Sequence, residues 1–143
     1  MSKPLRVATG TPVVIDSSVA FKWFDTTEPA ADIAAELLRA HQRDTTALIA
    51  PALLVPEVVN ALVCRGAPTA AVERAIGFLG DVDLLVAPID DAMLRAAARI
   101  ANDERLALYD ATFIALAARL EAELVTADRR QAQTGVCNVR LIS

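Results

Sequence analysis

The sequence predicts an α/β fold: a three-layer α/β/α sandwich whose central, mostly parallel sheet is covered by helices on both faces. Short runs rich in Val, Ile or Leu alternate along the chain with longer segments of helical character, and this alternation is typical of α/β proteins. The runs are apolar on both faces, as parallel strands are when helices cover each side. The spacers are long enough for right-handed crossovers.

Five short apolar segments are the expected strands. They are PVVI at 12–15, ALIA at 47–50, DLLVAPI at 83–89, ELVT at 123–126 and NVRLI at 138–142. No internal repeat, linker or low-complexity stretch interrupts the series. We therefore expect one domain over residues 1–143, a length that can bury a substantial core.

The spacers have helical periodicity. In residues 91–105, apolar residues recur at i, i+3, i+4 and i+7 from Leu94, while Asp91 and Arg95 form an acid-before-base pair four residues apart. Residues 111–120, ATFIALAARL, are apolar nearly all round. This segment is therefore expected to be the most buried helix, and its first turn should begin at Asp110.

Composition restricts the function. Acids outnumber basic residues by 18 to 14, which argues against a protein that coats nucleic acid through charge alone. Hydrophobic residues make up 55% of the chain and the mean hydropathy is +0.40. Some apolar surface should therefore remain exposed for a partner or for self-association.

Cys64 and Cys137 are far apart and belong to no Cys/His cluster, so neither a disulfide framework nor a zinc site is expected. No run resembles a signal peptide or a membrane span, since the apolar stretch ALIAPALLVP is short and broken by prolines. The expected location is the reducing cytoplasm.

Three aspartates occupy similar positions at the ends of predicted elements. Asp16 follows the first strand, Asp110 begins the most buried helix, and Asp128 follows the strand ELVT. Any one of them could simply cap a helix. Together they favour a site, because the carboxyl ends of parallel strands gather at one edge of the sheet, where ligands bind.

Glu57 is the fourth candidate acid. It lies in PALLVPEVVNALV, where Pro51 and Pro56 suit a helix start or first turn, and its neighbours are densely apolar. It could equally be an exposed residue of an amphipathic helix.

Clustered carboxylates raise one another's pKa and stay ionised only beside a cation, and oxygen ligands favour Mg²⁺ or Mn²⁺. Such ions activate water and stabilise a phosphoryl group under attack, so phosphodiester hydrolysis is the matching reaction. The single histidine, His41, is expected to be a surface or internally satisfied residue. Ribonuclease chemistry based on two histidines therefore lacks its second member.

Four segments, in order, resemble the signature segments of PIN-domain ribonucleases, specifically VapC toxins of bacterial type II toxin–antitoxin systems. They are VVIDSSVAFKW, PALLVPEVVNAL, LALYDATFIALAARL and LVTADRR. The resemblance implies a PIN-like fold and an endoribonuclease whose acidic pocket, made by Asp16, Glu57, Asp110 and Asp128, binds Mg²⁺ or Mn²⁺. It implies that the three aspartates hold the metal, directly or through water, and that Glu57 positions the nucleophilic water or a second ion.

Other residues could support this pocket. Thr126 matches a family hydroxyl, although a Thr at a strand end also caps helices. Ser17 or Ser18 is expected to cap the helix after the first strand, which would free Asp16 to face the cleft, and Ser18 could instead contact substrate. Trp23 fits packing better than stacking on a base.

Lys22, Arg65, Arg129 and Arg130 lie near the signature segments. They could contact RNA phosphates at the rim of the pocket or could be solvated helix charges, and the sequence favours neither.

The resemblance also implies a VapB-type antitoxin, whose carboxyl-terminal segment wraps the toxin and inhibits the acidic pocket, and a homodimer formed through helices. The high apolar content is consistent with both partners.

Two alternatives remain at this stage. A phosphoreceiver domain also holds Mg²⁺ at strand ends, but the chain lacks the acceptor Asp after a middle strand and the Lys after a late one. A PIN-like scaffold that binds RNA or protein without cutting is opposed only by the presence of all four acids.

Overall fold

The computed structural model describes residues 10–143 and contains one sheet of five strands, all parallel. The strands are β1 (Thr11–Ile15), β2 (Thr46–Pro51), β3 (Leu85–Ala87), β4 (Glu123–Thr126) and β5 (Val139–Leu141). The helices are α1 (Ser17–Phe21), α2 (Ala31–Gln42), α3 (Leu54–Cys64), α4 (Thr69–Asp81), α5 (Asp91–Glu104), α6 (Leu108–Leu120) and α7 (Arg129–Ala132). All five predicted strands are confirmed.

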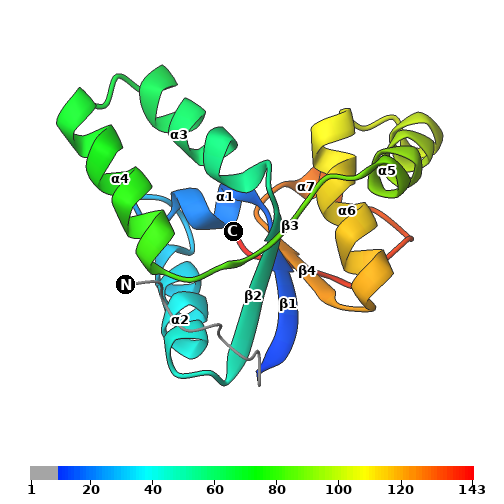
Figure 1. Ribbon diagram of the computed structural model, residues 1–143, viewed down its shortest axis with the longest axis horizontal. Helices are drawn as coiled ribbons and strands as arrows, with labels where there is room; N and C mark the ends of the chain where they lie inside the picture. Colours follow the sequence, from blue (N-terminus) through cyan, green and yellow to red (C-terminus); the bar gives the residue numbers. More distant parts are fainter. Residues whose placement is uncertain (1–9) are drawn as a thin grey trace.

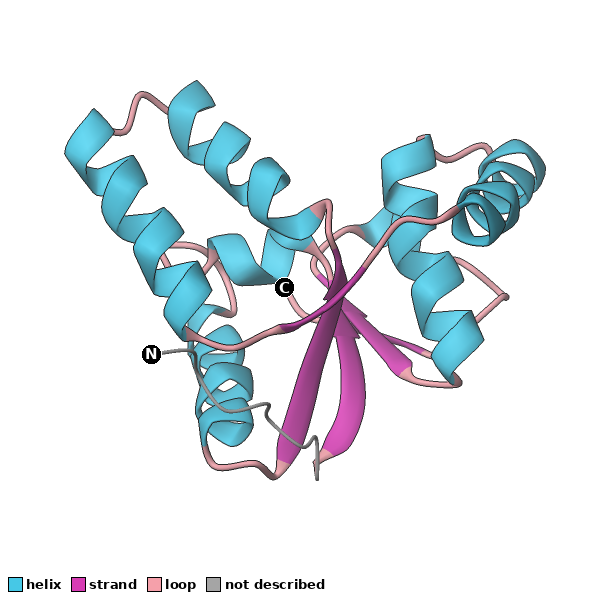
Figure 2. Ribbon diagram, in the orientation of Figure 1, coloured by secondary structure: helices cyan, strands magenta, loops and turns pink. Residues whose placement is uncertain are grey.

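The strand order is β3-β2-β1-β4-β5, and helices lie on either side of the sheet (Figure 2). The chain builds outward from β1 through β2 to β3, then returns to place β4 on the free side of β1. The register pairs Ile15 with Val125, and the amide of Asp16 continues the ladder by donating to the Val125 carbonyl at 3.3 Å. The order of strands therefore reverses between β1 and β4, the position at which open α/β sheets bind ligands.

Helices cover both faces of the sheet, as predicted. Helix α6 packs against β1, β2 and β4 on one face, with α5 outside it, while α1 and α2 contact β4 and β2 from the other (Figure 1). Every residue of α6 from Ala111 to Ala117 is buried, which confirms that it is the most buried helix. It begins at Leu108, however, so Asp110 lies within the first turn and does not start it.

Helices α3 and α4 form a hairpin that extends beyond the sheet (Figure 1). Pro56 lies in the first turn of α3, as predicted, because a proline there removes no hydrogen bond within the helix. Pro51 does not begin this helix and is instead the last residue of β2. None of the helices in residues 10–143 is long and apolar enough to cross a membrane. Cys64 and Cys137 are free.

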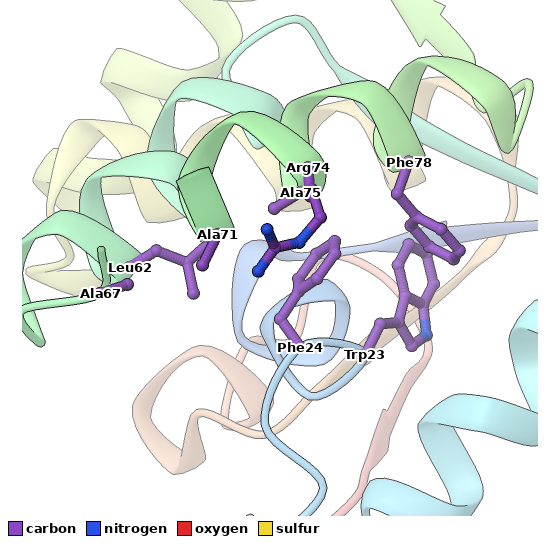
Figure 3. A pocket seen from close by; sticks show the side chains of 8 residues that line it. All are labelled: Trp23, Phe24, Leu62, Ala67, Ala71, Arg74, Ala75 and Phe78. Carbon is purple, nitrogen blue, oxygen red and sulfur yellow. The ribbon is translucent and has the colours of Figure 1, made fainter. Parts of the chain in front are cut away.

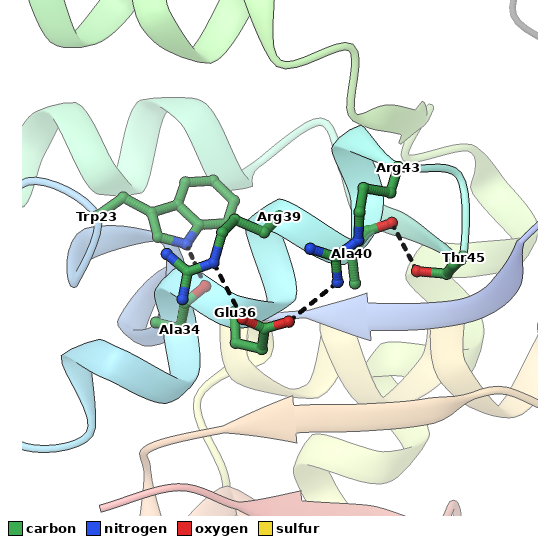
Figure 4. Close-up of polar contacts among 7 residues, drawn as sticks. All are labelled: Trp23, Ala34, Glu36, Arg39, Ala40, Arg43 and Thr45. Carbon is green, nitrogen blue, oxygen red and sulfur yellow. Dashed lines mark hydrogen bonds and ion pairs between the residues drawn. The ribbon is translucent and has the colours of Figure 1, made fainter.

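Helix α2 makes polar contacts on both its buried and its solvent-exposed side (Figure 4). The indole N–H of Trp23 donates to the Ala34 carbonyl at 2.9 Å, so the packing role predicted for Trp23 is confirmed. On the solvent side, Glu36 accepts from Arg39 and from Arg43, each at 3.0 Å. Such exposed pairs add little to stability, so the anchor is the apolar face of α2.

His41 is a structural residue of the core, with 1% of its surface exposed. Its Nδ1 accepts from the Leu48 amide at 3.0 Å, and its Nε2 lies 3.0 Å from the Val82 carbonyl and 3.1 Å from the Asp83 carbonyl. Since β3 pairs with β2 only from Ile49 onward, His41 satisfies an amide that the sheet leaves unpaired. The expectation of an internally satisfied histidine is confirmed.

We predict that His41→Phe lowers the free energy of unfolding by ~2–4 kcal/mol, because it leaves a buried amide and two carbonyls without their partner. Urea unfolding monitored by circular dichroism measures the change. At a temperature where the variant is folded, its circular dichroism spectrum should match that of the unchanged protein. An unchanged free energy of unfolding would contradict the structural assignment.

Candidate active site

A cleft of about 420 Å³ lies at the carboxyl end of the sheet, beside the β1–β4 switch point. It brings together all four acids that the sequence singled out, and each comes from a different helix start or first turn. They are Asp16 before α1, Glu57 in α3, Asp110 in α6 and Asp128 before α7.

Asp16 is buried, with 5% of its surface exposed, and both of its carboxylate oxygens are engaged. Oδ1 accepts from the Ser18 hydroxyl at 2.6 Å and from the Val19 amide at 3.3 Å, while Oδ2 lies 2.7 Å from the Thr126 hydroxyl. Asp16 is thus the N-cap of α1 as well as a wall of the cleft. The prediction that Ser17 or Ser18 caps this helix is wrong.

The two serines orient acids instead. Ser17 donates to Glu57 Oε1 at 2.9 Å, and Ser18, which donates to Asp16, accepts from the Ala127 amide at 3.0 Å. Both serines lie inside the first turn, where their hydroxyls point toward the cleft lining and not toward the free amides at the helix start. Each therefore fixes one acid of the cluster.

Thr126 and Gln131 form the buried floor of the site. The Thr126 hydroxyl accepts from the Asp128 amide at 2.9 Å and lies 2.7 Å from Gln131 Oε1. Gln131, 1% exposed, also donates through Nε2 to the Asp110 carbonyl at 2.9 Å. The supporting role predicted for Thr126 has a structural basis. Gln131 was missed, although the spacing of Asp128 and Gln131 is that of a capping box.

The Thr126 hydroxyl has one proton but faces two acceptors, Asp16 Oδ2 and Gln131 Oε1. The amide orientation of Gln131 is fixed, since its Nε2 donates to a carbonyl. Thr126 can therefore donate to only one of these two oxygens at a time.

Asp128 and Asp110 are less constrained. Asp128 caps α7 by accepting through Oδ1 from the Arg130 and Gln131 amides at 2.8 and 3.4 Å. Within residues 10–143 no donor hydrogen-bonds to the side chain of Asp110, so its carboxylate is available to a ligand.

The pKa values of three acids are raised. Burial raises the pKa of Asp16 to about 6, against the hydrogen bonds from Ser18, Thr126 and Val19, and the charge of Asp128 adds to the increase. Burial also raises the pKa of Glu57, with a contribution from Asp110.

Burial likewise raises the pKa of Asp110, where Asp128 adds to the increase and Arg130 opposes it. Electrostatic repulsion therefore links Asp16 to Asp128, Asp128 to Asp110, and Asp110 to Glu57. The four acids behave as one cluster.

The sequence matches the family model of the PIN domain over residues 13–136, which is most of the chain. The protein belongs to the PIN-domain family. The suspected family is therefore confirmed, and the all-parallel sheet is the PIN-like fold that the sequence predicted. No curated protein matches the sequence.

Solved structures share this PIN fold at low identity. PAE2754 from Pyrobaculum aerophilum is 22% identical with a TM-score of 0.67, covering 93% of this chain and 92% of that one. VapBC2 from Rickettsia felis, bound to a DNA fragment from its promoter, is 9% identical with a TM-score of 0.70, covering 93% and 100%. VapC20 from Mycobacterium tuberculosis, a toxin that cleaves the sarcin–ricin loop, is 16% identical with a TM-score of 0.69, covering 90% and 98%.

The donor set of this PIN domain fits a hard divalent cation in its chemistry. All four donors are carboxylates, they line one cleft, and their mutual repulsion is of the kind that a cation relieves. In the arrangement shown by residues 10–143, no three acid, His or Cys side chains are close enough to chelate one ion.

The four basic residues that could contact phosphates at the rim of the cleft lie in different positions in this PIN domain. Lys22 is buried, with 4% of its surface exposed, so it is not a solvated charge, and it does not line the cleft. Arg129 and Arg130 are exposed on α7 but do not line the cleft, and Arg130 donates to the Arg105 carbonyl at 3.0 Å. Arg65 does line the cleft.

We predict that Asp16→Asn stabilises the metal-free PIN domain at high pH. The folded-state pKa of Asp16, about 6, lies above its ordinary value of 3.8, so this residue favours folding fully below pH 3.8 and loses that contribution as the pH rises through 6. The difference is on the order of 3 kcal/mol. An asparagine can keep the cap and donate to Thr126 without ionising.

Urea unfolding in EDTA at a series of pH values measures this effect. The variant should be more stable than the unchanged protein near pH 8, and the difference should shrink toward pH 4. A stability difference that does not depend on pH would contradict the claim that ionising Asp16 destabilises the folded state.

Proposed function

We propose that this PIN domain is a metal-dependent endoribonuclease and the toxin of a type II toxin–antitoxin system. The observation that carries the proposal is the meeting of Asp16, Glu57, Asp110 and Asp128 in one cleft at the switch point of the sheet. The fold shared with VapC20 and VapBC2 supports the toxin assignment, and so does the resemblance of the four sequence segments.

The four acids would have different roles, because their surroundings differ. A bound Mg²⁺ or Mn²⁺ would lower the pKa of a water molecule and offset charge on the phosphoryl group. Asp16, Asp110 and Asp128 would hold the ion, with Asp16 locked by its hydrogen bonds and Asp110 free to adjust. Glu57, held by Ser17 through Oε1, would accept a proton from the attacking water, a role that its raised pKa suits.

We predict that Asp110→Asn lowers Mg²⁺-dependent RNA cleavage by on the order of 10²-fold or more, because it removes a ligand charge and leaves the fold intact. Asp16→Asn should do the same, and both variants should lose growth inhibition while still binding the antitoxin. The matched control is Asp91→Asn, which changes an exposed acid of α5 outside the cleft.

Sequencing of RNA 5′ ends after brief expression would identify the substrate and the cleavage site. Cleavage that survives either substitution would falsify the catalytic assignment. Intact RNA with the unchanged protein in Mg²⁺ and in Mn²⁺ would favour a scaffold that binds without cutting.

A groove of about 420 Å³ between the segment that follows α1 and the α3–α4 hairpin supports an antitoxin partner (Figure 3). Its lining is mainly apolar, with Arg74 the exception, and comprises Trp23, Phe24, Leu62, Ala67, Ala71, Arg74, Ala75 and Phe78. The rings of Phe24 and Phe78 meet edge to face at 5.6 Å. An amphipathic antitoxin segment would lay its apolar face in this groove.

A homodimer is the other proposed association. Helix α6 and the residues near it expose apolar side chains, among them Leu94, Leu108, Tyr109 and Leu120, which a second copy could cover.

The free cysteines are consistent with a cytoplasmic location, where the RNA substrate would be found.

We predict that Ala71→Glu weakens antitoxin binding by at least about tenfold, because it places a charge in the apolar groove. RNA cleavage by the isolated toxin should not change. The control is Ala70→Glu, which adds the same charge at the neighbouring exposed position of α4, outside the groove. Calorimetry with the antitoxin measures both variants, and equal effects of the two would contradict this location.

A further inference from the structure

The acidic cleft presents an electrostatic problem for RNA. Five carboxylates line it, because Glu28 at the mouth joins the four acids described above. An RNA backbone that enters must bring its phosphates close to these charges. Within residues 10–143, Arg65 is the only positively charged side chain that lines the cleft.

Arg65 stands at the end of a continuous track along α3. Glu57, Asn60, Ala61 and Cys64 line the cleft at i, i+3, i+4 and i+7, so one face of the helix runs along it, and Arg65 follows directly after the last turn. Arg65 lies eight positions after Glu57, so the helical rise places their backbones about 12 Å apart along the axis. That spacing is longer than one nucleotide step, so Arg65 would meet a phosphate beyond the scissile one.

The guanidinium of Arg65 is held at the mouth of the cleft. It lies 4.3 Å from the centre of the Phe21 ring, and its two terminal nitrogens lie 3.3 Å from Asp25 and 3.8 Å from Glu28. The Phe21 ring is buried, so it provides a rigid platform.

These ion pairs are easily exchanged. The Arg65 side chain is 55% exposed, and exposed ion pairs contribute little free energy. Asp25 also accepts from the amide and the hydroxyl of Thr27, so it keeps partners if Arg65 turns away. The guanidinium can therefore exchange carboxylates for a phosphate while it stays stacked on Phe21, and phosphate suits its fork of donors.

We propose that the α3 face from Glu57 to Arg65 is the path of the RNA strand and that Arg65 binds a backbone phosphate further along the strand than the one that is cleaved. This inference rests on the proposed ribonuclease function. It assigns the phosphate contact to Arg65, which lines the cleft, whereas Lys22, Arg129 and Arg130 do not.

The test is RNA binding in the inactive Asp16→Asn background. The probe is a fluorescein-labelled single-stranded RNA that spans the mapped cleavage site, and anisotropy is measured over a range of salt concentrations. Arg65→Ala should weaken binding and reduce the slope of log affinity against log salt by about 0.7, the share of one phosphate contact. Arg65→Lys should keep the slope, because it keeps the charge.

Arg95→Ala is the matched control, since it removes an exposed arginine of α5 far from the cleft with the same change in net charge. With Asp16 intact, Arg65→Ala should raise KM and leave kcat at saturating RNA unchanged. Thermal melting should show that Arg65→Ala is folded.

An unchanged slope in Arg65→Ala, or an equal loss in Arg95→Ala, would overturn the proposal and leave the ribonuclease function standing. If the unchanged protein cuts no RNA, the proposed function fails, and the assignment of Arg65 fails with it.

Discussion

The parallel pairing of β1 with β4 brings two distant segments of the chain side by side, and the candidate site depends on that pairing. Asp16 extends β1 and meets Thr126 at the end of β4, more than a hundred residues later in the sequence. The Thr126 hydroxyl then contacts the Asp128 amide and Gln131, and Gln131 reaches the Asp110 carbonyl. One buried hydroxyl thus connects the segments that carry three of the four acids.

The same aspartates stabilise helix starts and repel one another. Asp16 caps α1 and Asp128 caps α7, so each contributes to its helix, yet burial and like charges raise the pKa of Asp16 and Asp110. A protein selected for stability alone would not gather these charges at a buried edge. The presence of these acids is explained if the proposed cation binds between them and neutralises their charge.

The α3–α4 hairpin borders two different depressions in the surface, the acidic cleft and the apolar groove. One face of α3 runs along the acidic cleft from Glu57 to Arg65, whereas Leu62 on the same helix joins α4 in lining the apolar groove. The hairpin projects beyond the sheet (Figure 1). A partner bound in the groove would contact α3, the helix that also borders the cleft. Binding in the groove could therefore inhibit the proposed RNA cleavage through this helix.

Local patterns in the sequence determined the order and type of the elements, the burial of α6 and the four acids, because apolar periodicity and strand-end positions are properties of neighbouring residues. Only the tertiary structure decided which hydroxyl serves which carboxylate. Ser17 and Ser18 were expected to cap α1, but they bind Glu57 and Asp16, and Asp16 makes the cap. The burial of Lys22, the position of Arg65 over Phe21 and the role of Gln131 were likewise decided by packing. A polar side chain bonds to whatever the fold brings within reach, and those partners come from elements far away in the chain.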